Sequence, residues 1–310
     1  MRHNLDIVIV NWNSGALLRA CLESLAVTQL TELRVGRIMV VDNGSTDGSL
    51  EGVEHIHPLI QPIRNGRNLG FSVACNQAAV KCDAKYLLFL NPDTRIGPDS
   101  LRLPISFMEE RANETVAICG IRLLDAKGRV SRSCCRFPTG STLFYRATGL
   151  DRVLPRVFRG YAMTEWDHAQ STTVDHVIGA FYLVRRSVFE ALGGFDERYF
   201  VYLEDLDFSF RARNAGWRSY YLAEGCTYHA GGAISSQVKA TRLFYSLRSR
   251  ILYAFKHFGR ASAFSVLVST MLIEPFCRLS RGFFRCSREE IVDTIVGYSM
   301  LWKHLPKILT

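Results

Sequence analysis

Short apolar runs alternate with amphipathic stretches through the first 125 residues, and this alternation restricts the fold more than any other feature. The runs at 5–10, 37–41 and 86–90 have the length and composition of buried strands. Between the first two, residues 14–27 place apolar side chains at helical spacing behind Ser14, a residue type that caps helix N-termini. Strands and helices that alternate in this way predict an α/β sheet with crossover helices.

A polar cluster follows each of the three predicted strands. Asn11 comes after the first strand, Asp42 after the second, and Asn91-Pro92-Asp93 after the third. In open α/β sheets, ligands bind at the carboxyl edge of the strands. Three separate segments therefore indicate one binding edge.

Asp42 opens the segment DNGSTDG at 42–48. An acid at a strand end can accept a hydrogen bond from a pyrimidine ring N–H, while the glycines let the backbone turn sharply. The same residue types also make ordinary turns, so both interpretations stay open. The sequence has no glycine-rich dinucleotide motif after the first strand and no P-loop motif, which argues against those two nucleotide-binding classes.

Two further residues are candidate metal ligands. Asp93 directly follows a buried strand, where its carboxylate can hold a hard divalent cation that bridges diphosphate oxygens. The alternative is that Asp93 caps the next turn or helix, although Pro98-Asp99 is the better predicted helix start. His229 follows a strand predicted at 217–222, and its imidazole can complete a metal shell, although a lone histidine is more often structural.

Glu204, Asp205 and Asp207 open a helix predicted at 204–215. Acids are favoured at a helix start by the helix dipole, and Asp207 has the spacing of a surface ion pair with Arg211. Glu204 and Asp205 follow the aromatic run at 199–202, which we expect to form the wall of a pocket. A carboxylate in such a pocket can serve as a general base.

The middle of the chain is less regular. We expect a turn at 125–128, an extended segment at 129–137, a strand at 174–184 with a kink at Gly179-Ala180, and a short helix at 187–192.

The C-terminal region is strongly basic. From residue 236 onward, twelve lysines and arginines face four acids, which is a net charge of +8 out of +9 for the whole chain. The apolar run at 261–273 is stopped by Glu274-Pro275, and its 13 residues fall short of the roughly 20 that a spanning helix needs. We therefore expect an interfacial or core helix. Long aliphatic runs separate the charges and no recognised nucleic-acid motif occurs, so an anionic lipid or phosphorylated ligand is favoured over nucleic acid.

Cysteine usage and the N-terminus indicate the compartment. The nine cysteines are an odd number with no Cys-x-x-Cys pair, as expected for free thiols in a reducing environment. The chain runs straight into its first strand with no apolar segment of signal length, so we expect a cytoplasmic protein.

Seven short motifs occur in order within residues 5–235. They are IVNWN at 9–13, VDNGSTD at 41–47, NLGFSVACN at 68–76, LNPDT at 90–94, GGFDE at 193–197, EDLD at 204–207 and HAGG at 229–232. Together they closely resemble glycosyltransferase family 2, and within it the bacterial rhamnosyltransferase-like branch. The resemblance implies a GT-A fold, a Rossmann-like mixed sheet flanked by helices, here followed by a helical basic C-terminal extension. It also implies a nucleotide-sugar half at 1–125 and an acceptor-binding and catalytic half at 126–235. The helical basic region at 236–310 lies beyond the resemblance, and we expect it to associate with a membrane.

The resemblance assigns roles position by position. Asp42 is expected to recognise a uracil or thymine ring, with Asn11, Asn68 and Asn76 around the nucleotide-sugar. Asn91 stands where the family has the first acid of its Asp-x-Asp motif, so it supplies no charge.

Asp93 matches the acid that binds Mg²⁺ or Mn²⁺, and His229 matches a late histidine that is a candidate metal ligand. Asp205, with Glu204 beside it, matches the catalytic base.

The implied reaction is an inverting, metal-dependent sugar transfer in bacterial cell-surface glycan synthesis. The preferred donor is dTDP-rhamnose, with a UDP-linked galactose, glucose or N-acetylglucosamine as the alternative. The expected acceptor is a polyprenyl-diphosphate-linked saccharide or a glycan. The basic tail is expected to hold the protein peripherally on the inner face of the plasma membrane, with core packing or a homodimer contact as alternatives. A non-catalytic nucleotide-sugar-binding protein is the competing class.

Overall fold

The computed structural model describes residues 4–28, 30, 33–231 and 238–309 of the chain. Its contacts divide the chain into two compact units. Unit 1 comprises Met1–Cys135, Glu165–Glu197 and Glu204–Ile234, and unit 2 comprises Arg136–Thr164, Arg198–Leu203 and Ser235–Thr310. Gly232 of the HAGG motif and the expected boundary at 235–236 lie outside the described residues.

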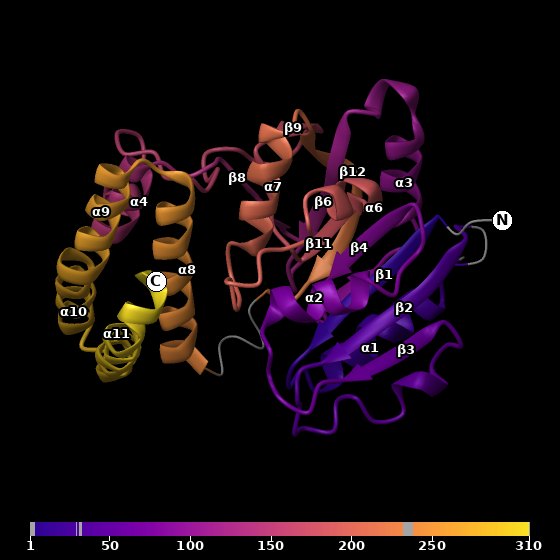
Figure 1. Cartoon of the computed structure of the whole chain (residues 1–310), viewed down its shortest axis with the longest axis horizontal. Helices are drawn as coiled ribbons and strands as arrows, with labels where there is room; N and C mark the ends of the chain where they lie inside the picture. The colour runs from indigo at the N-terminus through magenta and orange to yellow at the C-terminus, as the bar shows by residue number, and fades with distance from the viewer. Residues whose placement is uncertain (1–3, 29, 31–32, 232–237, 310) are drawn as a thin grey trace. The chain divides into compact units, whose positions relative to one another are not determined.

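Unit 1 is built on a ten-stranded mixed sheet with the strand order β3-β2-β1-β4-β11-β6-β12-β5, in which β7 pairs with β6 and β9 with β12 (Figure 1). Its first half is parallel and consists of β1 (Leu5–Asn11), β2 (Val35–Asp42), β3 (Ile60–Arg64) and β4 (Tyr86–Leu90). β1 lies between β2 and β4 and is buried at every position, which explains its nearly continuous apolar sequence. The predicted strands at 5–10, 37–41 and 86–90 are therefore confirmed.

The second half of the sheet is mixed, because β11 runs antiparallel to both of its neighbours. Its strands are β5 (Thr94–Ile96), β6 (Val116–Leu124), β7 (Val130–Ser131), β9 (Thr172–Val174), β11 (Phe181–Arg185) and β12 (Arg218–His229). A separate small sheet pairs β8 (Cys134–Cys135) with β10 (His176–Val177). The extended segments expected at 129–137 and 174–184 are thus each divided into shorter strands, and the second is interrupted at the predicted kink. The strand expected at 217–222 continues to His229.

The helices of unit 1 are α1 (Ala16–Ala26), α2 (Phe71–Ala79), α3 (Arg102–Glu109), α6 (Arg186–Ala191) and α7 (Glu204–Asn214), with single turns η1 (Val53–His55) and η2 (Arg111–Asn113). The expected cap of α1 by Ser14 is wrong. The cap position is Gly15, which has φ 53° and no side chain, while the buried Ser14 hydroxyl has no hydrogen-bond partner among the described residues. None of the nine cysteines, all of which the structure describes, forms a disulfide, as expected.

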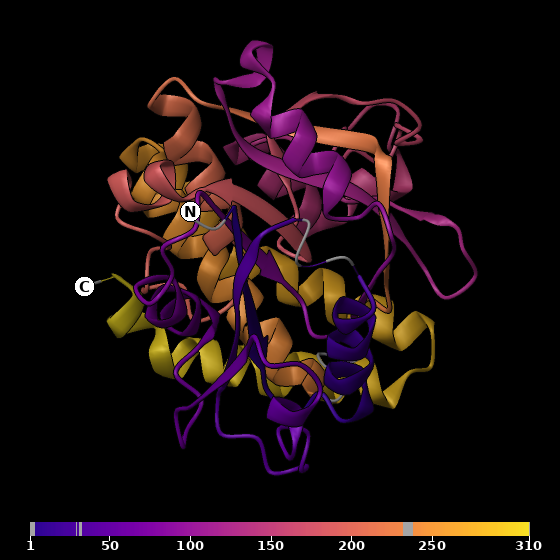
Figure 2. The same cartoon turned by 90° about the vertical axis from the view of Figure 1, so that its right-hand side faces the viewer.

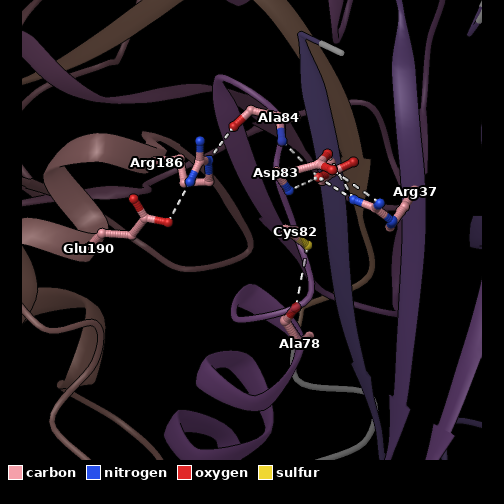
Figure 3. A network of polar contacts seen from close by, with 8 residues as sticks. Arg37, Ala78, Cys82, Asp83, Ala84, Arg186 and Glu190 are labelled. Carbon is pink, nitrogen blue, oxygen red and sulfur yellow. Dashed lines mark hydrogen bonds and ion pairs between the residues drawn. The ribbon is translucent and has the colours of Figure 1, made fainter. Parts of the chain in front are cut away.

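Asp6 is a buried acid in the otherwise apolar β1. Its carboxylate accepts the backbone N–H groups of Asp83 at 2.9 Å and Ala84 at 3.1 Å, and the Arg37 guanidinium lies 3.7 Å away. Figure 3 shows two further contacts of this loop. Arg37 pairs with Asp83, and Arg186 donates a hydrogen bond to the carbonyl oxygen of Ala84. The loop that leads into β4 is therefore fixed to β1, β2 and α6 together.

Every regular element among the described residues of unit 2 is helical (Figure 2). The elements are α4 (Gly140–Thr148), α5 (Leu150–Val153), α8 (Lys239–His257), α9 (Arg260–Val268), the π-helical turn η4 (Ser269–Ile273), α10 (Glu274–Phe284) and α11 (Arg288–Leu309). The helix that contains the apolar run at 261–273 was expected to end at Glu274-Pro275, but it continues beyond them. Pro275 lies in the first turn of α10, where a missing N–H costs little, and the helical segment continues to Phe284. This segment of 25 residues is long and apolar enough to cross a membrane by length and composition, so the expectation that it is too short was wrong.

Asp6 provides a stability test. We expect Asp6→Ala to lower the free energy of unfolding by about 2–4 kcal/mol, because the buried N–H of Ala84 and the partly buried N–H of Asp83 lose their acceptor. The matched control is Asp83→Ala, which removes a 64% exposed carboxylate from the same loop and should cost less than about 1 kcal/mol. Urea denaturation followed by circular dichroism measures both. Equal losses in the two variants would contradict the role assigned to Asp6.

Candidate functional site

The three polar clusters lie at one edge of the sheet. The parallel register places Asn11 of β1 opposite Asp42 of β2, and Ile9 of β1 opposite Leu90 of β4. Asn91 therefore follows the end of β4 next to the end of β1. The prediction that these strand ends form a common edge is confirmed.

Asp42 shapes the loop that follows β2. One carboxylate oxygen accepts the side-chain amide of Asn11 at 2.8 Å, and the other accepts the N–H groups of Gly44 at 3.2 Å and Ser45 at 3.1 Å. A carboxylate has about four acceptor positions, so these three contacts leave one for a ligand N–H. Asp42 therefore stabilises the turn, and its remaining acceptor position is compatible with recognition of a pyrimidine base.

Asn68 and Asn76 make contacts within the chain. The side-chain oxygen of Asn68 accepts the N–H of Gly70 in a turn before α2. The Asn76 amide donates to the carbonyl of Phe195 at 2.8 Å and accepts its N–H at 3.0 Å. A Cβ on Gly194 would lie 2.6 Å from the Asn76 side-chain oxygen, so the loop needs glycine there. Asn76 thus joins the motif at 68–76 to the motif at 193–197.

Asp93, His229 and Asn91 form a compact group. The Nε2 atom of His229 lies 3.2 Å from Oδ1 of Asp93 and 3.5 Å from the Asn91 amide. The antiparallel pairing of Thr94 in β5 with His229 in β12 brings these residues together. Asp93 does not cap α3, whose cap position is Leu101, and the predicted helix start at Pro98-Asp99 is a few residues early.

This group fits a divalent cation that is shared with phosphate. The described residues contain no group of three or more histidine, cysteine, aspartate or glutamate side chains able to hold a metal by themselves. Mg²⁺ and similar ions often take only one or two protein ligands and complete their shell with phosphate oxygens and water. Asp93 and His229 are suited to that arrangement.

Asp205 is held at the start of α7 by two backbone donors. Its Oδ2 accepts the N–H of Gly179 at 2.7 Å, and its Oδ1 accepts the N–H of Leu206 at 2.8 Å. The next residue after Gly179, Ala180, accepts the N–H of Asn91 at 3.0 Å. The kinked Gly179-Ala180 backbone therefore links Asp205 directly to the group around Asp93.

Glu204 has a different environment from its neighbour. It is buried, and its Oε2 atom has no hydrogen-bond partner among the described residues. Burial, reinforced by the charges of Asp205 and Asp207, raises the pKa of Glu204 well above its ordinary value. The two adjacent acids are therefore not equivalent, because Glu204 is buried without a donor to its Oε2 atom and Asp205 accepts two backbone N–H groups.

The backbone before these acids is strained. Tyr202 and Leu203 have φ angles of 70° and 67°, in the left-handed region that side chains rarely occupy. Such strain is typical of functional sites, where the surrounding structure imposes an unusual conformation. The aromatic run before them lies in unit 2, where Phe200 stacks on Tyr245 of α8. Its expected role as a pocket wall stays a prediction.

Asp207 is structural, as expected, but it is not on the surface. It is fully buried and pairs with Arg211 at 2.8 Å. Arg211 also donates to the carbonyl oxygens of Leu192 and Gly194, which fixes α7 to the loop that follows α6.

His176 was not identified from the sequence. Its Nε2 lies 3.6 Å from Oδ2 of Asp205, and its Nδ1 lies 3.0 Å from the Ser209 hydroxyl. Burial lowers the pKa of His176, so the imidazole is neutral at pH 7. Ser209 in turn contacts the Tyr182 hydroxyl at 2.8 Å, and Tyr182 donates to the carbonyl of Asp205. The only sequence signal was a polar residue inside an apolar strand.

Comparison with known proteins agrees with this geometry. A family model described as "Glycosyl transferase family 2" matches residues 6–193. The chain is 29% identical to the N-acetylglucosaminyl-diphospho-decaprenol L-rhamnosyltransferase of Mycobacterium tuberculosis, over 82% of this chain and 85% of that protein. It is 31% identical to rhamnosyltransferase WbbL of Escherichia coli, over 51% of this chain and 57% of that protein.

A solved structure shares the fold. Mannosyltransferase PcManGT from Pyrobaculum calidifontis, in complex with GDP-Man and Mn²⁺, has a TM-score of 0.58 at 14% identity, with 98% of this chain and 88% of that chain covered. The expected GT-A type of mixed sheet with flanking helices is thereby confirmed. Because the family model covers more than half of the sequence, the chain belongs to glycosyl transferase family 2.

Proposed function

We propose that this glycosyltransferase performs an inverting, metal-dependent transfer from a dTDP- or UDP-sugar, with L-rhamnose from dTDP-rhamnose as the preferred donor sugar. The observation that carries the proposal is the backbone link through Gly179-Ala180, because it holds Asp205 next to the group formed by Asn91, Asp93 and His229. A base and a site for a diphosphate are what a direct displacement at an anomeric carbon requires.

Asp205 is the proposed catalytic base, which accepts the proton of the acceptor hydroxyl as that oxygen attacks the sugar. The backbone donors at Gly179 and Leu206 orient its carboxylate, and neutral His176 borders it. Glu204 lies beside it, and burial raises the pKa of Glu204 well above its ordinary value, so its proposed role is to support Asp205 rather than to act as the base. Asp93 and His229 would hold Mg²⁺ or Mn²⁺, which supplies positive charge to the departing diphosphate.

The proposed donor site includes the residues near the ends of β1 and β2. Asp42 keeps one acceptor position for a uracil or thymine N–H, and Asn11 holds Asp42 in place. Asn68, Asn76 and Asn91 are proposed to frame the nucleotide-sugar.

The donor sugar and acceptor are proposed from the relatives. The Mycobacterium tuberculosis relative is named for rhamnosyl transfer to N-acetylglucosaminyl-diphospho-decaprenol, and WbbL is also a rhamnosyltransferase. A polyprenyl-diphosphate-linked saccharide in bacterial cell-surface glycan synthesis is therefore the proposed acceptor. A UDP-linked galactose, glucose or N-acetylglucosamine remains the alternative donor. The protein is proposed to act on the cytoplasmic face of the membrane, bound peripherally through its C-terminal region, with a homodimer contact as the alternative use of that region.

A donor panel tests the function. dTDP- and UDP-sugars are offered with a polyprenyl-diphosphate-linked N-acetylglucosamine acceptor, in Mg²⁺ or in EDTA, and the product is identified by mass spectrometry. We expect metal-dependent rhamnosyl transfer with inversion at the anomeric carbon. Binding of a nucleotide-sugar without turnover on any acceptor would favour the non-catalytic binder, and absence of nucleotide-sugar binding would refute both.

Asp205 should control turnover more than donor binding. We expect Asp205→Asn to lower kcat by about 10²–10⁴-fold, the usual contribution of a general base, with donor Kd changed by less than about threefold. Glu190→Gln is the matched control, because its carboxylate is exposed on α6 and pairs only with Arg186 among the described residues. Comparable kcat values for Asp205→Asn and the control would exclude Asp205 as the base.

Glu204 should make stability depend on pH. Because its pKa in the folded protein is raised above the ordinary value of 4.5, the unfolded chain loses the proton first as pH rises. The wild type therefore loses stability above pH 4.5, by about 1.4 kcal/mol per pH unit until the folded pKa is reached. Glu204→Gln does not titrate, so the unfolding free energy of the variant relative to wild type should rise once the pH exceeds 4.5, in a series measured from pH 4.5 to pH 7.5. A difference that is constant across this range in urea titrations would show that Glu204 is ionised in the folded protein.

Removal of the Asp93 carboxylate should weaken the metal-dependent part of nucleotide binding. We expect Asp93→Asn to weaken nucleoside-diphosphate binding at least ~10-fold in Mn²⁺ and to leave binding in EDTA unchanged, as measured by calorimetry. Asp99→Asn, which alters a 56% exposed carboxylate on the loop after β5, is the control. If Asp93→Asn keeps the full gain from Mn²⁺, the proposed ligand is wrong.

A further inference from the structure

The helix α10 exposes its apolar side. Phe276, Phe283 and Phe284 are 74%, 73% and 83% exposed, and Leu272 and Ile273 of the preceding turn are 53% and 37% exposed. Relative to Phe276, the other four side chains lie three or four residues before it and seven or eight residues after it. These spacings place all five on one face of the helix.

The opposite side of α10 carries charges that are bound within unit 2. Glu274 is 1% exposed and pairs with both Arg250 of α8 and Arg278, the latter at 2.7 Å. Arg281 lies 3.4 Å from Glu290 of α11. A helix on a water-exposed surface normally has the reverse arrangement, with its apolar side inward. The exposed side of α10 is therefore suited to an apolar environment.

These ion pairs argue against a helix that crosses a membrane, although the segment Arg260–Phe284 has the required length and hydropathy. A spanning orientation would carry Glu274, Arg278 and Arg281 into hydrocarbon and separate Glu274 from Arg250. One third of its most apolar window is also buried within the protein. An orientation in the plane of the interface keeps every ion pair and still covers the phenylalanines.

The charge of unit 2 specifies the kind of membrane. Unit 2 carries eighteen lysines and arginines against five acids, a net charge of +13, which leaves −4 on unit 1. Such a charge is attracted to anionic phospholipid, whereas a protein partner would need an acidic surface with an apolar centre. An anionic bilayer supplies both properties over any area.

The segment at α5 also combines exposed apolar side chains with arginines. Val153, Leu154 and Val157 are exposed beside Arg152 and Arg156. Burial, together with the positive charges of Arg146, Arg281 and Arg278, lowers the pKa of Arg152. α4, which is joined to α5, also packs against α10.

We propose that unit 2 docks on an anionic phospholipid bilayer with α10 in the plane of the interface, its phenylalanines among the acyl chains and the surrounding arginines at the level of the phosphates. This deepens the peripheral attachment in the proposed function, and it does not depend on which sugar is transferred.

Vesicle co-sedimentation tests the docking. The full chain is mixed with sucrose-loaded vesicles of phosphatidylcholine alone or of phosphatidylcholine and phosphatidylglycerol at a ratio of about 3:1. We expect binding to the anionic vesicles that weakens with salt. The triple variant F276S/F283S/F284S should bind at least ~10-fold more weakly, because each phenylalanine loses its buried apolar area. The control V27S/V80S alters side chains of unit 1 that are 84% and 87% exposed and should bind as wild type does.

Three results would overturn the proposal. They are absence of wild-type binding to anionic vesicles, equal binding by the triple variant, and retention in the membrane pellet after alkaline carbonate extraction, which indicates a spanning helix. A dimer that forms without lipid and is lost in the triple variant would assign this face to a second copy of the chain. Nucleotide-sugar binding by the same preparations reports separately on the proposed function, so a failure of one is distinguishable from a failure of the other.

Discussion

The hydrogen bond from the Gly179 N–H to Asp205 is the interaction on which the arrangement of the site depends. Gly179 lies in the gap between β10, which ends at Val177, and β11, which begins at Phe181. The neighbouring Ala180 carbonyl accepts the N–H of Asn91. The three residues between β10 and β11 thus connect the start of α7 with the end of β4.

The second constraint is the burial of Glu204 beside Asp205. Two adjacent carboxylates in a poorly solvated position cannot both be ionised at low cost, because each charge destabilises the other. Here the hydrogen bonding of the two acids is unequal. The Oε2 atom of Glu204 has no donor among the described residues, whereas Asp205 accepts two backbone N–H groups. The chain therefore separates the two acids by environment, although they are neighbours in sequence. The left-handed backbone at Tyr202 and Leu203, immediately before them, turns the chain into α7 at this point.

The sequence was most informative where one local signal determined the structure. β1 and β4 were predicted because buried parallel strands need continuous apolar runs, and α7 because its first turn is acidic and Gly216 follows its end. Prediction failed where distant contacts or backbone detail decided. Pro275 suggested a helix end, yet a proline in a first helical turn is tolerated after the π-helical turn η4. His176 could not be recognised, because its contacts with Asp205 and Ser209 come from α7, about thirty residues later in the chain.

The electrostatics of the sheet edge provide an independent argument for a cation there. Asp42, Asp93 and Asp205 form no ion pair with a lysine or arginine in the part of the chain that the structure describes. A nucleoside diphosphate brought to this edge would add negative charge to three carboxylates, and at short range in a partly buried site that repulsion is substantial. Positive charge at this edge would reduce that repulsion. A divalent ion held by Asp93 would supply such charge to both the carboxylate and the phosphates.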